Sequence, residues 1–123
     1  MEQLYKPGCP FCERALKKEY DYIRRSYISM EIISFEPLNP VTPGHRLFMP
    51  KTHVEHGRWS NRIVGAVYEA AYEYATGYRD DFNLIISSGE AATQTIDHIH
   101  VHYVPRRPND NLTLPWTGQK KEH

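Results

Sequence analysis

The chain has 123 residues, with 15 basic and 15 acidic side chains and a formal net charge of zero. This length fits a single domain, which we expect to span residues 1–123 with a core over about 9–106 and a C-terminal tail over 107–123. The balanced charge argues against a protein that coats a nucleic-acid polymer or an anionic membrane. No apolar run is long enough for a membrane span, and the first residues lack the apolar stretch of a signal peptide, so we expect a cytoplasmic protein.

Short elements are expected in the first half of the chain. The pattern favours a short helical turn over residues 13–18, after the second cysteine. Strands are expected around residues 20–23 and at 31–35. A loop rich in proline and glycine follows over residues 37–44, and a third strand begins at 47–49.

One long amphipathic helix is expected after Ser60, which is a suitable N-cap residue. Apolar side chains recur at helical spacing beyond it, at Ile63, Val67, Ala70, Ala71, Tyr74 and Tyr78. Two further strands are expected at 83–87 and 99–104, joined by a loop that contains Gly89. The sequence therefore predicts an α+β fold with an antiparallel five-stranded sheet, one long helix and a short N-terminal helix.

Three histidines, His98, His100 and His102, stand two residues apart. Side chains on a strand alternate between its faces, so this spacing directs all three imidazoles to one side. The residues that follow them in alternation, Ile99, Val101 and Tyr103, would then pack into the core. Because imidazole titrates near neutral pH, such a row indicates a site for chemistry or metal rather than an ordinary polar strand face.

The segment around these histidines resembles the signature of the histidine triad (HIT) family. Gln94-Thr95 precede the three histidines and Pro105-Arg106 follow them. A second stretch, residues 35–53, resembles the same family, and the likeness runs from about Cys9 to Arg106. It implies a HIT-like fold and a hydrolase or transferase that acts on the α-phosphate of a nucleotide, of the nucleoside phosphoramidate or dinucleoside polyphosphate type.

The resemblance implies that His100 is the catalytic nucleophile and forms a covalent nucleotidyl-histidine. A neutral imidazole can attack phosphorus only if its other nitrogen carries a proton held by an acceptor. We expect that acceptor to be the backbone carbonyl of His98. Four further residues are expected to contact the phosphate, the last through its backbone N–H: His45, His102, Thr95 and Gln94.

Three positions depart from the family pattern. Pro37 stands where an Asp or Asn commonly binds the ribose hydroxyls, and we expect Glu36 or Asn39 to substitute for it or sugar recognition to be weaker. Thr93 replaces a usual glycine, and Ser87 replaces a frequent asparagine. These departures leave the preferred nucleotide and leaving group open.

The only two cysteines form the motif Cys9-Pro10-Phe11-Cys12, which resembles a glutaredoxin active site. On that interpretation the protein would be a thiol oxidoreductase. A thioredoxin-like fold, however, needs a substantial strand before the motif, and only eight residues precede it. The same pair is equally half of a zinc site, because zinc takes four sulfur or nitrogen ligands.

Bacterial members of the HIT family carry such a cysteine pair, and the resemblance implies a structural Zn²⁺ held by Cys9, Cys12, His53 and His98. Four protein ligands close the coordination sphere, so this ion would not activate water. We therefore favour zinc over redox chemistry. A zinc-stabilised nucleotide-binding module without turnover is the other alternative to the enzyme.

A homodimer is expected for two reasons. The long helix and the tail carry more apolar surface than one small sheet readily covers, at Val67, Ala71, Tyr74, Leu112, Leu114 and Trp116. The family resemblance also implies pairing through the long helix and an edge strand about a two-fold axis. In such a dimer we expect Trp116 of one subunit to lie near the nucleotide pocket of the other.

Overall fold

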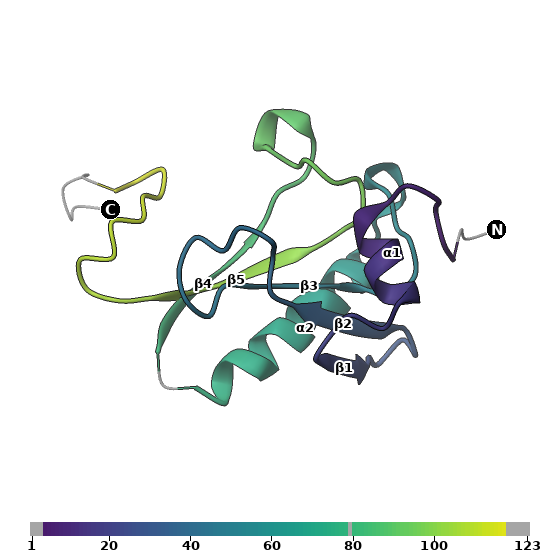
Figure 1. The fold of residues 1–123 in the computed structure, drawn as a ribbon, viewed down its shortest axis with the longest axis horizontal. Helices are drawn as coiled ribbons and strands as arrows, with labels where there is room; N and C mark the ends of the chain where they lie inside the picture. Colours follow the sequence, from purple (N-terminus) through teal and green to yellow (C-terminus); the bar gives the residue numbers. More distant parts are fainter. Residues whose placement is uncertain (1–3, 79, 118–123) are drawn as a thin grey trace.

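The computed structural model describes residues 4–78 and 80–117, so the end of the expected tail, residues 118–123, lies outside it. Nine elements follow one another in this part of the chain: α1 (Pro10–Leu16), β1 (Tyr22–Arg25), β2 (Glu31–Phe35), β3 (Arg46–Pro50), the short 3-10 helix η1 (His56–Arg58), α2 (Asn61–Thr76), β4 (Asp81–Ile86), the 3-10 helix η2 (Glu90–Ala92) and β5 (Val101–Arg106). The strands form one sheet in the order β1-β2-β3-β5-β4 (Figure 1). Every neighbouring pair is antiparallel, which confirms the predicted α+β fold.

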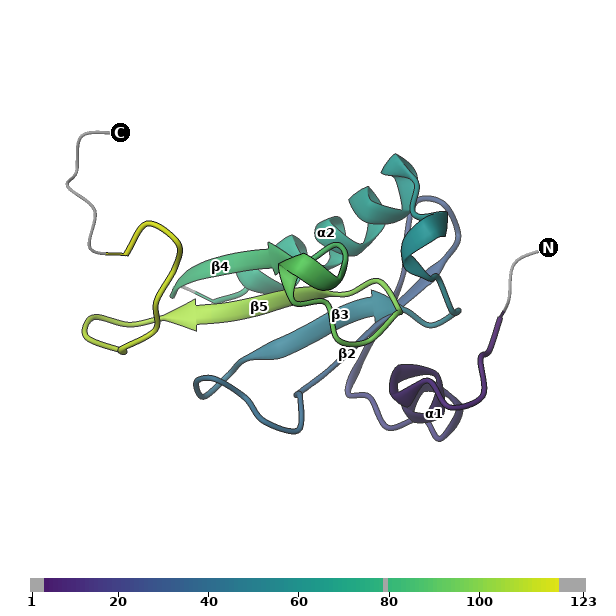
Figure 2. The same cartoon turned by 90° about the horizontal axis from the view of Figure 1, so that it is seen from above.

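The long helix α2 covers one face of the sheet (Figure 2). It presents small side chains to the strands, so its backbone lies close to the sheet, and together they form one core cluster: Ala66, Val67, Ala70, Ala71 and Ala75 from the helix, with Ile32, Phe48, Val101 and Tyr103 from the sheet. The Ser60 hydroxyl accepts the Ile63 N–H at 3.3 Å, as the N-cap prediction requires. Val67 and Ala71 are fully buried here, so they are not the exposed surface that the sequence suggested for a dimer.

The N-terminal segment and α1 cover part of the opposite face, where a second cluster lies. It joins Cys9, Phe11, Cys12 and Ala15 to Ile33, Phe35, Leu47 and Met49 of the strands. Residues of β2 and β3 alternate between the two clusters, as the period of a strand requires. The histidines of the triad face this second side, because Val101 and Tyr103, which alternate with them, point toward α2.

Element boundaries differ from the sequence prediction at several ends. Helix α1 begins at Pro10 rather than at residue 13, because the Cys9 sulfur accepts the Cys12 N–H at 3.5 Å and caps the helix with proline in its first turn. Strand β1 starts two residues later than expected. Strand β4 starts two residues earlier than expected, and β5 ends two residues later. Among the described residues, no helix is long and apolar enough to cross a bilayer.

Candidate active site and metal centre

His100 lies just before β5, buried with 7% of its surface exposed. Its Nδ1 lies 2.8 Å from the carbonyl oxygen of His98, so Nδ1–H donates to that oxygen. The lone pair of the imidazole is then on Nε2. Burial lowers the pKa of His100, which favours this neutral form.

His45 and His102 form a hydrogen-bonded pair beside His100. The Val41 N–H donates to His45 Nδ1 at 3.1 Å, so the proton of neutral His45 is on Nε2. That Nε2–H faces His102 Nδ1 at 2.9 Å, which leaves the proton of His102 on its own Nε2. The ring of His102 is 5.2 Å from that of His100, so its N–H donor belongs to the same site.

Phe11 packs against the nucleophile candidate from α1. Its ring centroid is 5.0 Å from that of His100 and 5.7 Å from that of His98, edge to face in both cases. Phe35 in turn packs against Phe11, with a distance of 5.7 Å between the two ring centroids. These contacts could not be predicted from the sequence, in which Phe11 is marked only by its position between the two cysteines.

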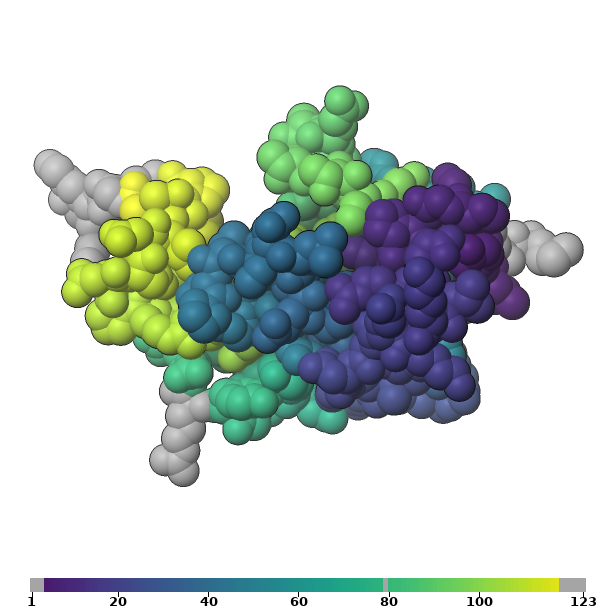
Figure 3. Space-filling view, in the orientation of Figure 1, coloured from purple at the N-terminus to yellow at the C-terminus, as the bar shows by residue number. Residues whose placement is uncertain are grey.

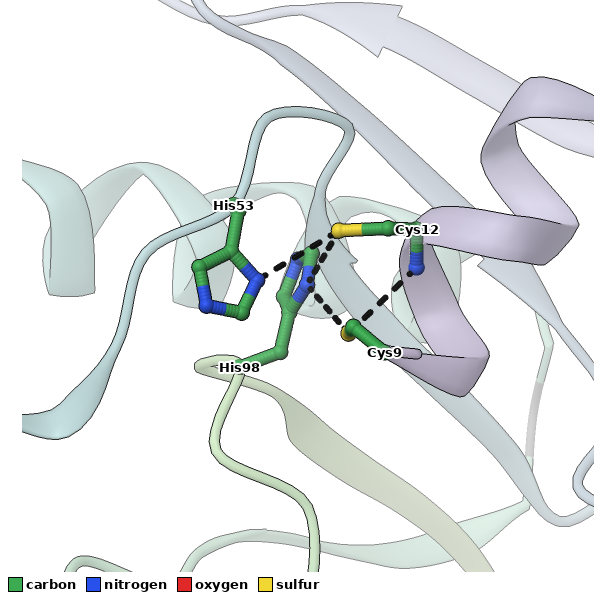
Figure 4. Close-up of side chains that lie close together, drawn as sticks. All are labelled: Cys9, Cys12, His53 and His98. Carbon is green, nitrogen blue, oxygen red and sulfur yellow. Dashed lines mark hydrogen bonds between the residues drawn. The ribbon is translucent and has the colours of Figure 1, made fainter. Parts of the chain in front are cut away.

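Four side chains meet at the N-terminus of α1 and form a separate cluster (Figure 4): Cys9, Cys12, His53 and His98. Their ligand atoms all lie within 4.8 Å of one another, and all four residues are buried. The two cysteines come from the cap and first turn of α1, His53 from the segment after β3, and His98 from the approach to β5. The structure thus brings together the four residues that the family resemblance implied as metal ligands.

The spacing within this cluster fits a tetrahedral zinc ion. The Cys12 sulfur is 3.4 Å from His53 Nδ1 and 3.6 Å from His98 Nδ1, and the Cys9 sulfur is 3.5 Å from His98 Nδ1. A tetrahedron with ordinary zinc–sulfur and zinc–nitrogen bond lengths has sulfur–nitrogen edges of about 3.6 Å. His98 Nε2 donates to the Pro50 carbonyl at 2.7 Å, which keeps the proton off Nδ1 and leaves that atom free for a metal.

The same surroundings disfavour redox chemistry at the cysteine pair. Cys9 is 7% exposed and Cys12 only 1%, so neither sulfur is open to a disulfide partner. Burial raises the pKa of the Cys12 thiol to about 11, whereas a reactive cysteine needs a lowered value. The antiparallel sheet also shows that the glutaredoxin fold is wrong for this chain.

A cleft of about 440 Å³ adjoins His102 on the face away from α2. His45 also lines it, together with residues of β4, β5 and the tail. Thr95 instead lines a second hollow beside Cys9 and His53. Thr95 therefore does not line the cleft that His45 and His102 share.

The loop before the triad holds two further predicted residues. The Gln94 N–H already donates to the Gly89 carbonyl at 3.1 Å, so a phosphate contact there would require this turn to open. Thr93 has a φ of 68°, in the left-handed region that favours glycine, which accounts for the glycine usual at this position in the family. Glu36 and Asn39 are exposed beside Pro37, on the loop between β2 and β3.

A HIT domain model matches residues 27–109 of the chain. The chain belongs to the HIT family. Residues Cys9 and Cys12 lie outside the matched range, yet they complete a cluster with two histidines inside it. The prediction made from the two histidine-bearing motifs is thus confirmed.

Three comparisons bear on the site. The adenylylsulfatase HINT3 of Arabidopsis thaliana is 37% identical over 81 residues, which are 60% of this chain and 41% of that protein. The adenosine 5′-monophosphoramidase HNT1 of Saccharomyces cerevisiae is 27% identical over 121 residues, which are 94% of this chain and 73% of that protein. A zinc-bound histidine triad protein of Mycobacterium smegmatis superimposes with a TM-score of 0.73 at 29% identity, covering 87% of this chain and 81% of the other.

The chain is shorter than several relatives. It spans 41% of the Arabidopsis protein and 59% of the related protein hit of Bacillus subtilis. The activities of these longer proteins are therefore not assigned to this chain by similarity alone.

Proposed function

We propose that this protein is a hydrolase or transferase acting on the α-phosphate of a nucleotide through a covalent nucleotidyl intermediate on His100. The observation that carries the proposal is the contact between His100 Nδ1 and the His98 carbonyl at 2.8 Å. It fixes the tautomer in which Nε2 presents a lone pair, as a nucleophilic imidazole requires. The enzymatic names of the Arabidopsis and yeast relatives support the same class of chemistry.

For a nucleoside phosphoramidate the reaction has two displacements. In the first, the Nε2 lone pair of His100 forms a bond to the α-phosphorus, and the bond from phosphorus to the leaving nitrogen breaks. The amine leaves with that electron pair and takes a proton from solvent. In the second, a water oxygen attacks phosphorus, the histidine bond breaks with its electrons returning to Nε2, and the water proton passes to solvent as the nucleoside monophosphate departs.

The neighbouring histidines would stabilise the charge that develops on the phosphate oxygens. His102 Nε2–H is the donor that the pair with His45 leaves free, and His45 would act through His102 by fixing its tautomer. Thr95, an exposed residue, is proposed to contact the phosphate or the leaving group through its hydroxyl.

We propose that the cluster of Cys9, Cys12, His53 and His98 holds one structural zinc ion. The fit of the sulfur–nitrogen distances supports this, as does the zinc-bound relative from Mycobacterium smegmatis. Zinc would bind the cysteines as thiolates and fix the start of α1 to the sheet. The backbone carbonyl of His98 also accepts the hydrogen bond from His100 Nδ1–H, so the ion would help to hold the nucleophile in place.

We propose that two copies of the chain form a homodimer. Strand β4 is an edge of the sheet, with β5 as its neighbour, so its outer hydrogen-bonding groups are available to a second copy. Tyr72 of α2 is 58% exposed and lies 6.2 Å from Phe82 of β4, which places an aromatic surface next to that edge. Trp116 is 52% exposed, and its approach to a partner's pocket stays a prediction, as does the cytoplasmic location.

The proposal is tested by His100→Asn, which keeps a polar side chain of similar reach without a nucleophilic nitrogen. We expect kcat on an adenosine phosphoramidate to fall by at least about a thousandfold, while the affinity for the monophosphate product changes little, because the lost group acts in bond making. Turnover near the wild-type rate would end the proposal.

A further inference from the structure

The loop between β2 and β3, residues 36–45, reaches the pair of His45 and His102 through one backbone group. The Val41 N–H donates to His45 Nδ1 at 3.1 Å. Little of this loop is fixed by burial, since Leu38 is 90% exposed and Val41 56%. Its shape instead comes from a turn, in which the His45 N–H donates to the Thr42 carbonyl at 3.1 Å, and from contacts with the segment after β5.

Arg107 makes these contacts. Its Nη1 donates to Thr42 Oγ1 at 3.1 Å and its Nη2 to the Pro43 carbonyl at 3.2 Å, so one guanidinium group binds two acceptors of the turn. Its backbone N–H donates to Asp110 Oδ2 at 3.1 Å, which ties it to the tail. In Figure 3 the blue loop lies against the yellow-green segment that follows β5. Arg107 is not among the described residues that line the cleft beside His102, so it fastens the loop from outside that cleft.

Gly44 lets the loop lie against β5. Its φ is +91°, in the left-handed region that favours glycine, and a Cβ there would lie 3.1 Å from Pro105 Cγ. A side chain at this position would therefore separate the loop from the strand. Residues 41–44 are thus held by two separate contacts, at Pro105 and at Arg107, and these keep the Val41 N–H opposite His45.

The direction of the hydrogen bond between His45 and His102 depends on the Val41 N–H. Two arrangements of the protons keep a bond between the rings, whose nitrogens are 2.9 Å apart. In one, both histidines carry the proton on Nε2; in the other, both carry it on Nδ1 and His102 donates to His45. Only the first leaves His102 with an Nε2–H for a phosphate oxygen. The second would set the His45 Nδ1–H against the Val41 N–H, two donors face to face, so the Val41 amide selects the first.

We infer that Arg107 is a positioning residue for this histidine pair: by holding the loop in place, it keeps the Val41 N–H on His45 and so keeps the proton of His102 on Nε2. The effect on turnover rests on the proposed function, whereas the effect on the tautomers does not. Without Arg107 the turn loses the contacts that fasten it to the segment after β5. The Val41 amide then moves away from His45, and the two proton arrangements become closer in free energy.

NMR of the protein labelled with ¹⁵N at histidine tests the tautomers directly, because the nitrogen shifts report which ring nitrogen carries the proton. At neutral pH both rings are uncharged, since burial lowers the pKa of His45 and lowers that of His102 to about 4. The wild type should show both rings protonated on Nε2. Arg107→Met, which keeps an apolar side chain of similar length without a donor, should show a mixture of the two tautomers. Thr42→Val removes one acceptor, leaves the charge of Arg107 and should cause a smaller change in the same direction.

Kinetics with adenosine 5′-phosphoramidate separate this role from attraction of the substrate's charge. Arg107→Met should lower kcat about tenfold with KM little changed, because the displaced donor acts on the phosphate in the transition state. Adding Thr42→Val should cost less than the product of the two single effects, because both changes break the same contact. Arg107→Lys should recover part of the loss, since an ammonium group can bind one of the two acceptors but does not span both.

Arg25→Met is the matched control. Arg25 is also exposed, and its Nη1 donates to a turn carbonyl, that of Ser29 at 3.2 Å between β1 and β2, so this variant should keep the tautomers and kcat of the wild type. Unchanged tautomers in Arg107→Met would overturn the inference. A raised KM with unchanged kcat would also overturn it, because Arg107 would then attract the substrate's charge. Changed tautomers in Arg107→Met, together with no turnover by the wild type, would overturn the proposed function and leave the positioning role standing.

Discussion

His98 links the cluster that it forms with Cys9, Cys12 and His53 to His100 through two different groups. Its Nδ1 lies 3.5 Å from the Cys9 sulfur, while its backbone oxygen accepts a hydrogen bond from His100 Nδ1–H, with 2.8 Å between the two heavy atoms. Its Nε2 is held by the Pro50 carbonyl, so the ring has no freedom to turn. Any change in the position of His98 therefore moves both a proposed metal ligand and the acceptor that orients the proposed nucleophile.

The first prediction concerns zinc. Freshly purified protein should contain about one zinc ion per chain, measured by elemental analysis. Cys12→Ala should lose the ion and lower Tm by about 10 °C, yet keep part of its activity, because the ion is proposed to stabilise structure and not to react. A chelator should lower Tm of the wild type and leave that of Cys12→Ala unchanged.

Two results would contradict the zinc assignment. One is protein without metal before any chelation. The other is rapid alkylation of Cys9 at neutral pH in the native protein, which would favour the redox alternative.

A second prediction concerns Phe11, whose ring edge lies against His100. Phe11→Leu keeps an apolar side chain but removes the flat surface that limits rotation of the imidazole, so kcat should fall about tenfold with KM little changed. Zinc content should be retained. Phe48→Leu, at an aromatic contact with Tyr74 on the α2 side of the sheet, is the matched control. Equal kcat values for the two variants would show that Phe11 serves only for packing.

The pH dependence of stability provides a third prediction. Burial, helped by the neighbouring His100 and His45, lowers the pKa of His102 to about 4 from 6.5. The unfolded chain therefore takes up this proton first, so the stabilising effect is present above about pH 6.5 and is lost as the pH falls toward 4. His102→Gln should reduce the slope of unfolding free energy in this window by up to about 1.4 kcal/mol per pH unit. Urea unfolding at several pH values measures it, and parallel profiles for the two proteins would refute it.

The fourth prediction concerns assembly. The wild type should have the mass of a dimer by light scattering at micromolar concentration. Tyr72→Glu should produce monomers, because it puts a charge on the aromatic surface beside β4. Tyr27→Glu changes a tyrosine of similar exposure, 56%, away from that edge and should remain dimeric. A monomer mass for the wild type would contradict the proposed dimer. An unchanged substrate preference in Trp116→Ala would contradict the proposed approach of the tail to the partner's pocket.

Local patterns were enough to predict much of this molecule. The two-residue spacing of His98, His100 and His102 placed them on one side of the sheet, opposite Val101 and Tyr103. The spacing did not show that β5 begins only at Val101, so that His98 precedes the strand and its side chain joins the cluster with Cys9, Cys12 and His53. The start of α1 was missed because cysteine is not an expected cap residue, and here the Cys9 sulfur fills that role.

Contacts made by the tail could not be predicted from the sequence. Asp110 reaches Arg106 because Asn109 and Asn111 adopt left-handed backbone conformations, with φ of 60° and 61°. Nothing in a linear pattern specifies that these residues return to the sheet rather than continue away from it. The pairing of Arg106, which lines the cleft beside His102, depends on this path of the tail.

Mass spectrometry of the protein quenched in base during turnover of an adenosine phosphoramidate would detect the proposed covalent intermediate. We expect a fraction of the wild-type chains to carry the mass of one adenylyl group, fragmentation to place it on His100, and His100→Asn to carry none. Turnover without any adduct, or an adduct on Cys9 or another residue, would contradict it.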